Sequence, residues 1–166
     1  LISVKNLSVD YITEADPINA VRNVSFEIFR GEIFGLVGES GSGKSTVIQA
    51  MMRILPPPAL ISKGKVFVDG KNIMEASEQD IIGFRWKQIS IVMQSALNAL
   101  NPVLSVREQI FDVLNTHKGL IGKEAEDRAR ELLSLVDIDF THLESYPHQL
   151  SGGMKQRIVI AIALAI

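Results

Sequence analysis

The residues with the clearest chemistry lie between Gly38 and Thr46, where the chain reads Gly-Glu-Ser-Gly-Ser-Gly-Lys-Ser-Thr. This spacing fits the pattern G-x-x-x-x-G-K-[ST], which wraps a loop around phosphate groups. Glycines let backbone N–H groups turn inward and approach phosphate oxygens, because no side chain intervenes. The pattern predicts a nucleoside triphosphate site. The competing interpretation is a glycine-rich turn beside a chance lysine.

Residue chemistry predicts a role for each part of this loop. Lys44 supplies a positive charge to the β- and γ-phosphates and is the loop's catalytic candidate. The Ser45 hydroxyl is the expected Mg²⁺ ligand. The loop residues expected to bind the nucleotide are Gly38, Ser40, Gly41, Ser42, Gly43, Lys44, Ser45 and Thr46.

A strand and a helix are expected to hold the loop in place. The short apolar run Ile33–Val37 directly before it is typical of a strand buried on both faces. A helix-like stretch follows from Lys44 to Leu55 and ends before three prolines. Because a helix N-terminus favours anions, this context favours the nucleotide site over the glycine-rich turn.

The remaining segments divide into strands and then helices. Alternating apolar residues predict strands at 2–11, 21–28 and 65–69 and a further strand at 89–93, with turns at Glu14–Asn19 and Asp69-Gly70. Past residue 102 the pattern is helical. Ser105 and Glu108 form a capping box, residues 123–136 are amphipathic, and Ser151 is placed to cap a last helix.

Composition excludes several classes of protein. The chain has 166 residues, 46% of them hydrophobic, and a formal net charge of −2. This apolar content excludes disorder as the main state, and the charge argues against nucleic-acid binding through bulk charge. The absence of cysteine excludes a disulfide scaffold and a thiol nucleophile. No apolar run is long enough to span a membrane, so a membrane role would need a partner.

A second glycine motif lies at Leu150–Gln156, which reads Leu-Ser-Gly-Gly-Met-Lys-Gln. By itself it is a small-residue turn opening a helix, and a simple helix cap is the alternative. Together with Gly38–Thr46 it resembles the nucleotide-binding domain of ATP-binding cassette (ABC) transporters. The first motif is similar to their Walker A, and the second to their signature motif.

The resemblance implies an α/β fold, a P-loop NTPase core with an antiparallel β subdomain and an inserted α-helical subdomain. Residues 1–94 are then the nucleotide-binding α/β core, which contains the N-terminal antiparallel strands, the Walker A and the Q-loop. Residues 95–150 form the α-helical subdomain, and residues 151–166 form the signature motif and its helix.

The family's further site residues have counterparts here. Gln94 lies where the family has its Q-loop glutamine, which reaches Mg²⁺ and the attacking water; an ordinary strand-end glutamine is the alternative. Tyr11 lies where the family stacks an aromatic ring on adenine; a buried core tyrosine is the alternative. The signature residues expected to close over the nucleotide from a neighbouring domain are Ser151, Gly152 and Gly153.

Finer motifs are similar to the oligopeptide and dipeptide importer branch. They are Asn98–Pro102 after the Q-loop, Tyr146–Gln149 before the signature, and Gly38–Ser40. Two positions depart from the wider family pattern. Met154 stands where a glutamine is common, and Ser95-Ala96 replaces an acidic residue and a proline.

The resemblance implies an ATPase subunit that binds ATP and Mg²⁺ and couples hydrolysis to uptake of a solute, expected to be peptides. Its implied partners are transmembrane permease subunits, a second nucleotide-binding domain paired head to tail, and indirectly an extracytoplasmic solute-binding protein. No nucleic-acid partner is expected, and the implied location is the cytoplasmic face of the membrane. The alternative is a non-transport cassette ATPase acting as an assembly switch. A P-loop kinase with a chance Ser-Gly-Gly is a third possibility.

The helical apolar pattern still continues at Ile158–Ile166. We expect a fragment of a longer chain; a C-terminal helix buried all round is the alternative. The family continues to a Walker B strand and a catalytic glutamate, which cannot be matched here. We therefore expect the C-terminal part of the core to be missing, and this chain to bind nucleotide but hydrolyse little of it. We also expect Ile33–Val37 to form an open apolar edge that promotes oligomers.

Overall fold

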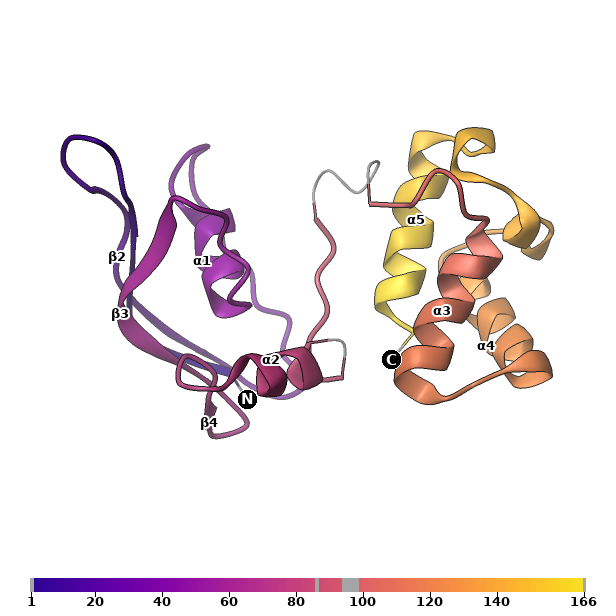
Figure 1. Cartoon of the computed structure of the whole chain (residues 1–166), viewed down its shortest axis with the longest axis horizontal. Helices are drawn as coiled ribbons and strands as arrows, with labels where there is room; N and C mark the ends of the chain where they lie inside the picture. The colour runs from indigo at the N-terminus through magenta and orange to yellow at the C-terminus, as the bar shows by residue number, and fades with distance from the viewer. Residues whose placement is uncertain (1, 86, 94–98, 166) are drawn as a thin grey trace. The chain divides into compact units, whose positions relative to one another are not determined.

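A computed structural model describes residues 2–85, 87–93 and 99–165 of the chain. These residues form two compact units, one up to Ile81 and one from Ile82 onward (Figure 1). Helix α2, Glu78–Phe84, spans the boundary between them. Each unit has its own secondary structure and is described by itself.

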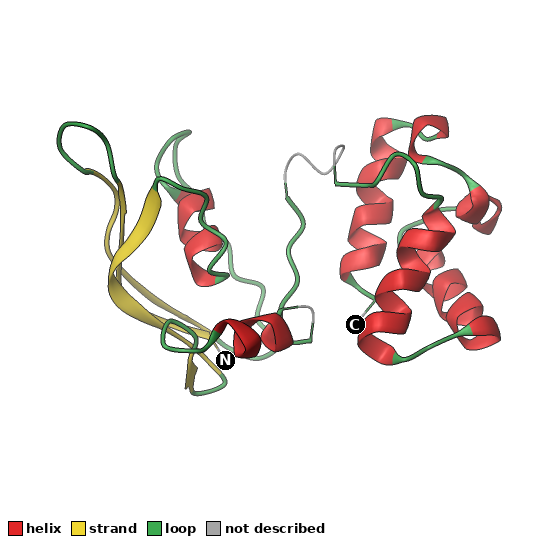
Figure 2. Ribbon diagram, in the orientation of Figure 1, coloured by secondary structure: helices red, strands yellow, loops and turns green. Residues whose placement is uncertain are grey.

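The first unit is built on a four-stranded antiparallel sheet with the order β2-β1-β3-β4 (Figure 2). The strands are β1 Ile2–Tyr11, β2 Ile18–Ile28, β3 Ala59–Val68 and β4 Lys71–Asn72. The three strands predicted for these regions are confirmed. The Asp69-Gly70 turn is also confirmed, with positive φ values of 46° and 81°, as a tight hairpin requires.

Helix α1, Lys44–Met51, lies against this sheet and contacts β1 and β2. The helix buries Val47 and Ala50, and β1 buries Val4, Leu7 and Val9. Removing these apolar side chains from water stabilises the unit by roughly 25 cal/mol per Å² of apolar surface. The sheet and α1 therefore form the support on which the glycine-rich loop rests.

Helix α1 ends at Met51, earlier than the predicted Leu55. Arg53 adopts a left-handed φ of 52°, and its N–H donates to Ala50 O at 3.0 Å. The Ile54 N–H donates to Gln49 O at 3.0 Å, which completes a Schellman motif. The Arg53 guanidinium also donates to Ala76 O at 2.7 Å. Backbone capping therefore ends the helix before the prolines are reached.

The predicted strands at Ile33–Val37 and 89–93 are wrong for this structure. Ile33–Val37 is irregular, with Ile33 99% and Val37 90% exposed, although Phe34 stacks on Phe26 with ring centroids 5.0 Å apart. Within 89–93, only Ile89 forms an isolated bridge, with Arg85. A strand needs hydrogen-bonded neighbours, and the sheet of the described residues consists of β1 to β4 alone.

The second unit is helical, as predicted (Figure 2). It contains α3 Val106–Lys118, α4 Gly122–Leu135 and α5 Gly152–Ala163, with 3₁₀ turns η2 Phe140–Glu144 and η3 Pro147–Gln149. One apolar core joins the helices, and its fully buried side chains include Ile110, Leu114, Leu132, Leu133 and Ile158. Within the described residues, no helix has the length and apolar character needed to cross a bilayer.

The predicted capping box at the start of α3 is present. The Glu108 N–H donates to Ser105 Oγ at 3.2 Å, and the Ser105 N–H donates to Glu108 Oε2 at 2.7 Å. These bonds satisfy two backbone donors that the helix itself leaves without acceptors. They lower the pKa of Glu108, chiefly through the backbone bond to Ser105.

Candidate functional site

One pocket of about 530 Å³ brings the glycine-rich loop together with the end of the sheet. This volume lies within the usual range for small-molecule sites. The lining residues are Tyr11, Ile18, Asn19, Ala20, Gly41, Ser42, Gly43, Lys44, Ser45 and Thr46. An aromatic ring at one end and a loop rich in backbone amides at the other suit a molecule with a flat base and a phosphate chain.

The Lys44 ammonium is hydrogen-bonded to the glycine-rich loop that precedes it. It donates to Gly38 O at 2.8 Å and to Glu39 O at 2.5 Å, and it contacts Ser42 Oγ at 3.3 Å. These bonds hold a full positive charge beside the loop's backbone. A phosphate oxygen is a stronger, charged acceptor for the same ammonium.

The N-terminus of α1 faces the pocket with open donors. Gly43 is the N-cap residue and forms no side-chain cap, and the first intrahelical bond runs from Val47 N to Gly43 O at 2.9 Å. The N–H groups of Lys44, Ser45 and Thr46 therefore lack acceptors within the helix. Together with the helix dipole, they make this end attractive to an anion.

One glycine of the loop is required by close approach. A Cβ on Gly43 would lie 2.7 Å from Ala20 O, and Gly43 also has a φ of +87°. A Cβ on Gly38 would lie 2.8 Å from Ser42 Oγ, a contact that rotation of the serine side chain would relieve. The Gly43 contact joins the loop to β2 at Ala20, so the sheet sets the position of the helix N-terminus.

The signature-like turn lies in the second unit, at the start of α5. Ser151 is the N-cap residue, and its Oγ accepts from Met154 N at 3.3 Å. A hydroxyl that accepts one bond still has its own proton to donate. Gly152 and Gly153 form the first turn of α5, and a Cβ on Gly153 would meet no atom within 4 Å.

A pocket of about 390 Å³ adjoins this turn. It is lined by Asp137, Ile138, Asp139, His142, Ser151, Gly153, Met154 and Arg157. Arg157 Nη1 donates to Val136 O and to Asp137 O, each at 3.3 Å. This arginine links the end of α4 to the first turns of α5. The turn at Ser151 is therefore stabilised by contacts within the second unit.

Not every predicted site residue lies in these pockets. Gln94 and the departures Ser95 and Ala96 lie outside the described residues. Gly38 reaches the site through its carbonyl bond to Lys44, and Ser40 is in the loop but does not line the pocket.

Sequence reasoning missed the β2 side of the pocket. Ile18, Asn19 and Ala20 line it, and β2 begins at Ile18, within the turn predicted at Glu14–Asn19. Antiparallel pairing places Ile18 opposite Tyr11. If a shorter turn had been predicted after Tyr11, Tyr11 would have been paired with Ile18, which would have indicated these residues.

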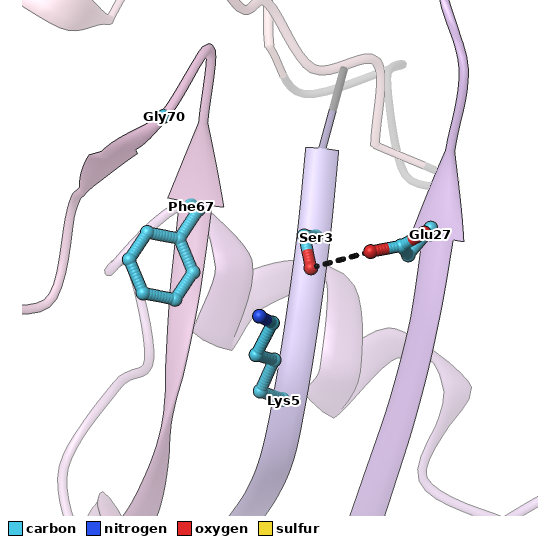
Figure 3. A pocket seen from close by; sticks show the side chains of 5 residues that line it. All are labelled: Ser3, Lys5, Glu27, Phe67 and Gly70. Atoms are coloured by element: carbon cyan, nitrogen blue, oxygen red, sulfur yellow. Dashed lines mark hydrogen bonds between the residues drawn. The ribbon is translucent and has the colours of Figure 1, made fainter.

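A smaller hollow of about 280 Å³ lies elsewhere on the sheet, where its charged groups already have partners. Figure 3 shows Ser3 and Glu27 pointing toward one another, and Ser3 Oγ donates to Glu27 Oε1 at 3.2 Å. The Lys5 ammonium lies 5.4 Å from the Phe67 ring centroid. This hollow lacks the open helix N-terminus of the larger pocket and does not suit a phosphate chain.

The ABC transporter family model matches residues 21–166, which include the glycine-rich loop, α1 and the turn at Ser151. This chain belongs to the ABC transporter family. The family resemblance seen in the two motifs is thereby confirmed.

Curated relatives come from the peptide-transport branch. The chain is 40% identical over 168 residues to the oligopeptide transport ATP-binding protein OppD of Bacillus subtilis, covering 99% of this chain and 47% of that protein. It is 42% identical over 167 residues to the dipeptide transport ATP-binding protein DppD of the same organism, covering 99% of this chain and 50% of that protein. The chain thus spans about half the length of these relatives.

Solved cassette structures share the fold. The dimeric structure of MJ0796, described as a bacterial ABC transporter cassette, matches with a TM-score of 0.88 and 30% identity, covering 99% of this chain and 69% of that one. A post-hydrolysis dimer of the same cassette, bound to ADP and Pi, matches with a TM-score of 0.87 and 30% identity, with the same coverage. The predicted fold class, an ABC-type α/β core with antiparallel and helical parts, is confirmed.

Proposed function

We propose that this chain is the ATP-binding part of an ABC importer subunit that couples ATP binding and hydrolysis to uptake of a solute, with peptides as the solute class. The observation that carries this proposal is that Tyr11, Lys44 and the open N-terminus of α1 line the same pocket. The names of the relatives support the peptide class.

In this proposal one part of the pocket binds the adenine of ATP and another part binds its phosphates. Tyr11 stacks on adenine, since a flat aromatic face tolerates any base orientation within its plane. The loop amides and Lys44 bind the phosphates. Ser45 is exposed at the start of α1, and its hydroxyl is a hard oxygen ligand suited to Mg²⁺ beside phosphate oxygens. Gln94 is the second proposed metal and catalytic residue.

The turn at Ser151–Gly153 is proposed to contact the γ-phosphate held by a second nucleotide-binding domain. Two observations support this role: the Ser151 hydroxyl keeps a proton to donate, and the cassette MJ0796 is described as a dimer. Head-to-tail pairing would then close two such sites. Either a second copy or a different cassette subunit fits this arrangement.

The remaining partners follow from the importer role. Permease subunits would receive the cassette at the cytoplasmic face of the membrane, and an extracytoplasmic binding protein would deliver the solute. In this division of labour residues 1–94 bind the nucleotide, residues 95–150 form the helical subdomain, and residues 151–166 carry the signature. The net charge of −2 gives no reason to add a nucleic-acid partner.

Nucleotide binding is tested by thermal unfolding with ATP and Mg²⁺. At 100 times its dissociation constant, ATP should stabilise the chain by about 2.7 kcal/mol, which is roughly 5–10 °C for a chain of this size. Lys44→Ala should lose most of this shift, because the phosphates lose their ammonium. Lys71→Ala, an exposed lysine on β4 away from the pocket, is the matched control and should keep it. The absence of a shift in the parent chain would contradict the proposal.

The importer role is tested separately by co-expression with candidate permease subunits. The importer role is supported if the chain is retained on a purified permease. Retention should be reduced in high salt, and it should also be reduced in a control that contains detergent without permease. Nucleotide binding without any retention on a permease would favour the alternative assembly switch.

A further inference from the structure

Two bulges flank the end of β1 beside the nucleotide pocket. Val9 pairs with Val21 and Asp10 with Asn19, so Ala20 is an extra residue in β2. On the other side, Ser8 pairs with Lys63 and Val9 with Ile61, so β3 carries an extra residue at position 62. Bulges bend a strand and re-aim its side chains, and they are frequent next to active sites.

The bulge in β2 bears directly on the phosphate loop. Ala20 is the residue whose carbonyl approaches Gly43 so closely that a Cβ there would lie at 2.7 Å. One step further along, Tyr11 pairs with Ile18 on one side and with Ala59 on the other. The direction of Tyr11 therefore depends on how the three strands are held after their bulges.

Asp10 lies between the two bulges, and its side chain bonds to β2. Asn19 Nδ2 donates to Asp10 Oδ1 at 2.5 Å, and Ser62, the extra residue of β3, lies close enough to lower the pKa of the Asp10 carboxyl. Arg22 Nε in turn donates to Asn19 Oδ1 at 2.7 Å. Asn19 also lines the nucleotide pocket, whereas Asp10 does not, so the Asp10–Asn19 bond anchors a pocket residue from outside the pocket.

We propose that Asp10 is a positioning residue that fixes the base-stacking face of Tyr11 by bonding across the β2 bulge to Asn19. This inference rests on the proposed nucleotide binding and adds a residue that determines how the site recognises the base. The ionised carboxylate suits the role. The hydrogen bonds from Ser62 and then Asn19 lower its pKa, and Lys63 and Arg22 add to the effect.

The test compares affinity for ATP with affinity for inorganic tripolyphosphate, which lacks a base. Asp10→Ala should weaken ATP binding about tenfold, because stacking on Tyr11 is lost, and leave tripolyphosphate binding within about twofold. Asp10→Asn keeps a side-chain oxygen that can accept from Asn19 Nδ2, so it should recover most of the ATP affinity. Glu27→Ala is the matched control, since Glu27 bonds to Ser3 across the same two strands, away from this pocket.

Each outcome decides the matter. Equal ATP affinity in Asp10→Ala and the parent chain would overturn the positioning role, and so would an equal loss of ATP and tripolyphosphate, which indicates general damage to the unit. A parent chain that binds neither ligand would overturn the proposed function itself. An ATP-selective loss in Glu27→Ala as large as that in Asp10→Ala would show that any cross-strand bond matters equally, and would also overturn the inference.

Discussion

The glycine-containing N-termini of α1 and α5 differ in how their unpaired backbone N–H groups are capped. Both begin with backbone N–H groups that lack acceptors within the helix. At α1 the cap is Gly43, which offers no side chain, so the donors stay open toward the pocket. At α5 the cap is Ser151, whose hydroxyl accepts from Met154 N. A helix N-terminus with uncapped N–H groups suits an anion that is bound deeply by its own loop. A helix N-terminus capped by its own serine suits a turn that adds one contact to a ligand held by another domain.

The two ends also differ in what supports them. Leu150, just before the α5 cap, is buried in the helical core. The segment Ile33–Val37 before the α1 loop is largely exposed and pairs with no strand of the described sheet. The α1 loop therefore depends on the Ala20 contact at Gly43 and on the Lys44 bonds. Glycine-to-alanine substitutions at the two ends should have opposite consequences.

The largest effect is expected for Gly43→Ala. Alanine at a φ of +87° is strained by about 1–3 kcal/mol, and its Cβ would collide with the Ala20 carbonyl. We expect a lower free energy of unfolding in urea and loss of the ATP-induced thermal shift. Gly41→Ala is the control, because Gly41 has a φ of +79° and open space around it. If both variants lose the same amount, the Ala20 contact has no effect of its own.

A smaller loss is expected for Ser151→Ala. Removing an N-cap hydroxyl destabilises a helix by about 1 kcal/mol, and the Met154 N–H loses its acceptor. Urea unfolding followed by helical circular dichroism measures the change. Ser151→Thr keeps the hydroxyl and should behave almost like the parent chain. Unchanged stability in Ser151→Ala would mean that α5 does not depend on this cap.

A gain is expected for Gly153→Ala, in contrast to Gly43→Ala. Gly153 lies in α5 without a left-handed φ, and a Cβ there meets no atom within 4 Å. Replacing a helical glycine by alanine stabilises by roughly 0.5–1 kcal/mol. The same urea titration measures it. Destabilisation would show that the first turn of α5 is more crowded than the structure indicates.

The smallest effect concerns pH at the α3 cap. The bonds from Ser105 lower the pKa of Glu108 below its ordinary value of 4.5. A carboxyl with a depressed folded pKa stabilises the fold above its unfolded pKa, and this contribution disappears as pH falls through the folded value. Thermal unfolding between pH 7 and about pH 3 should therefore show an acid-dependent loss that is smaller in Glu108→Gln. Identical profiles would contradict the assignment to Glu108.

The sequence by itself indicated the glycine-rich loop, the turn at Ser151–Gly153 and most of the secondary structure. Gly38–Thr46 and Ser151–Gly153 are local patterns, and their chemistry depends on residues that are neighbours along the chain. The capping box at Ser105 and Glu108 was predictable for the same reason. Capping and glycine spacing need no distant partner.

Only the tertiary structure decided which residues face the loop. Ala20 meets Gly43, and Asp10 bonds to Asn19, because bulges shift the strand register, and no local pattern encodes a shift between separate strands. The failed strand prediction at Ile33–Val37 has the same cause. An apolar run indicates that a segment would gain by being buried. It does not show that a neighbouring strand is present, and a strand forms only where neighbouring backbone supplies its hydrogen bonds.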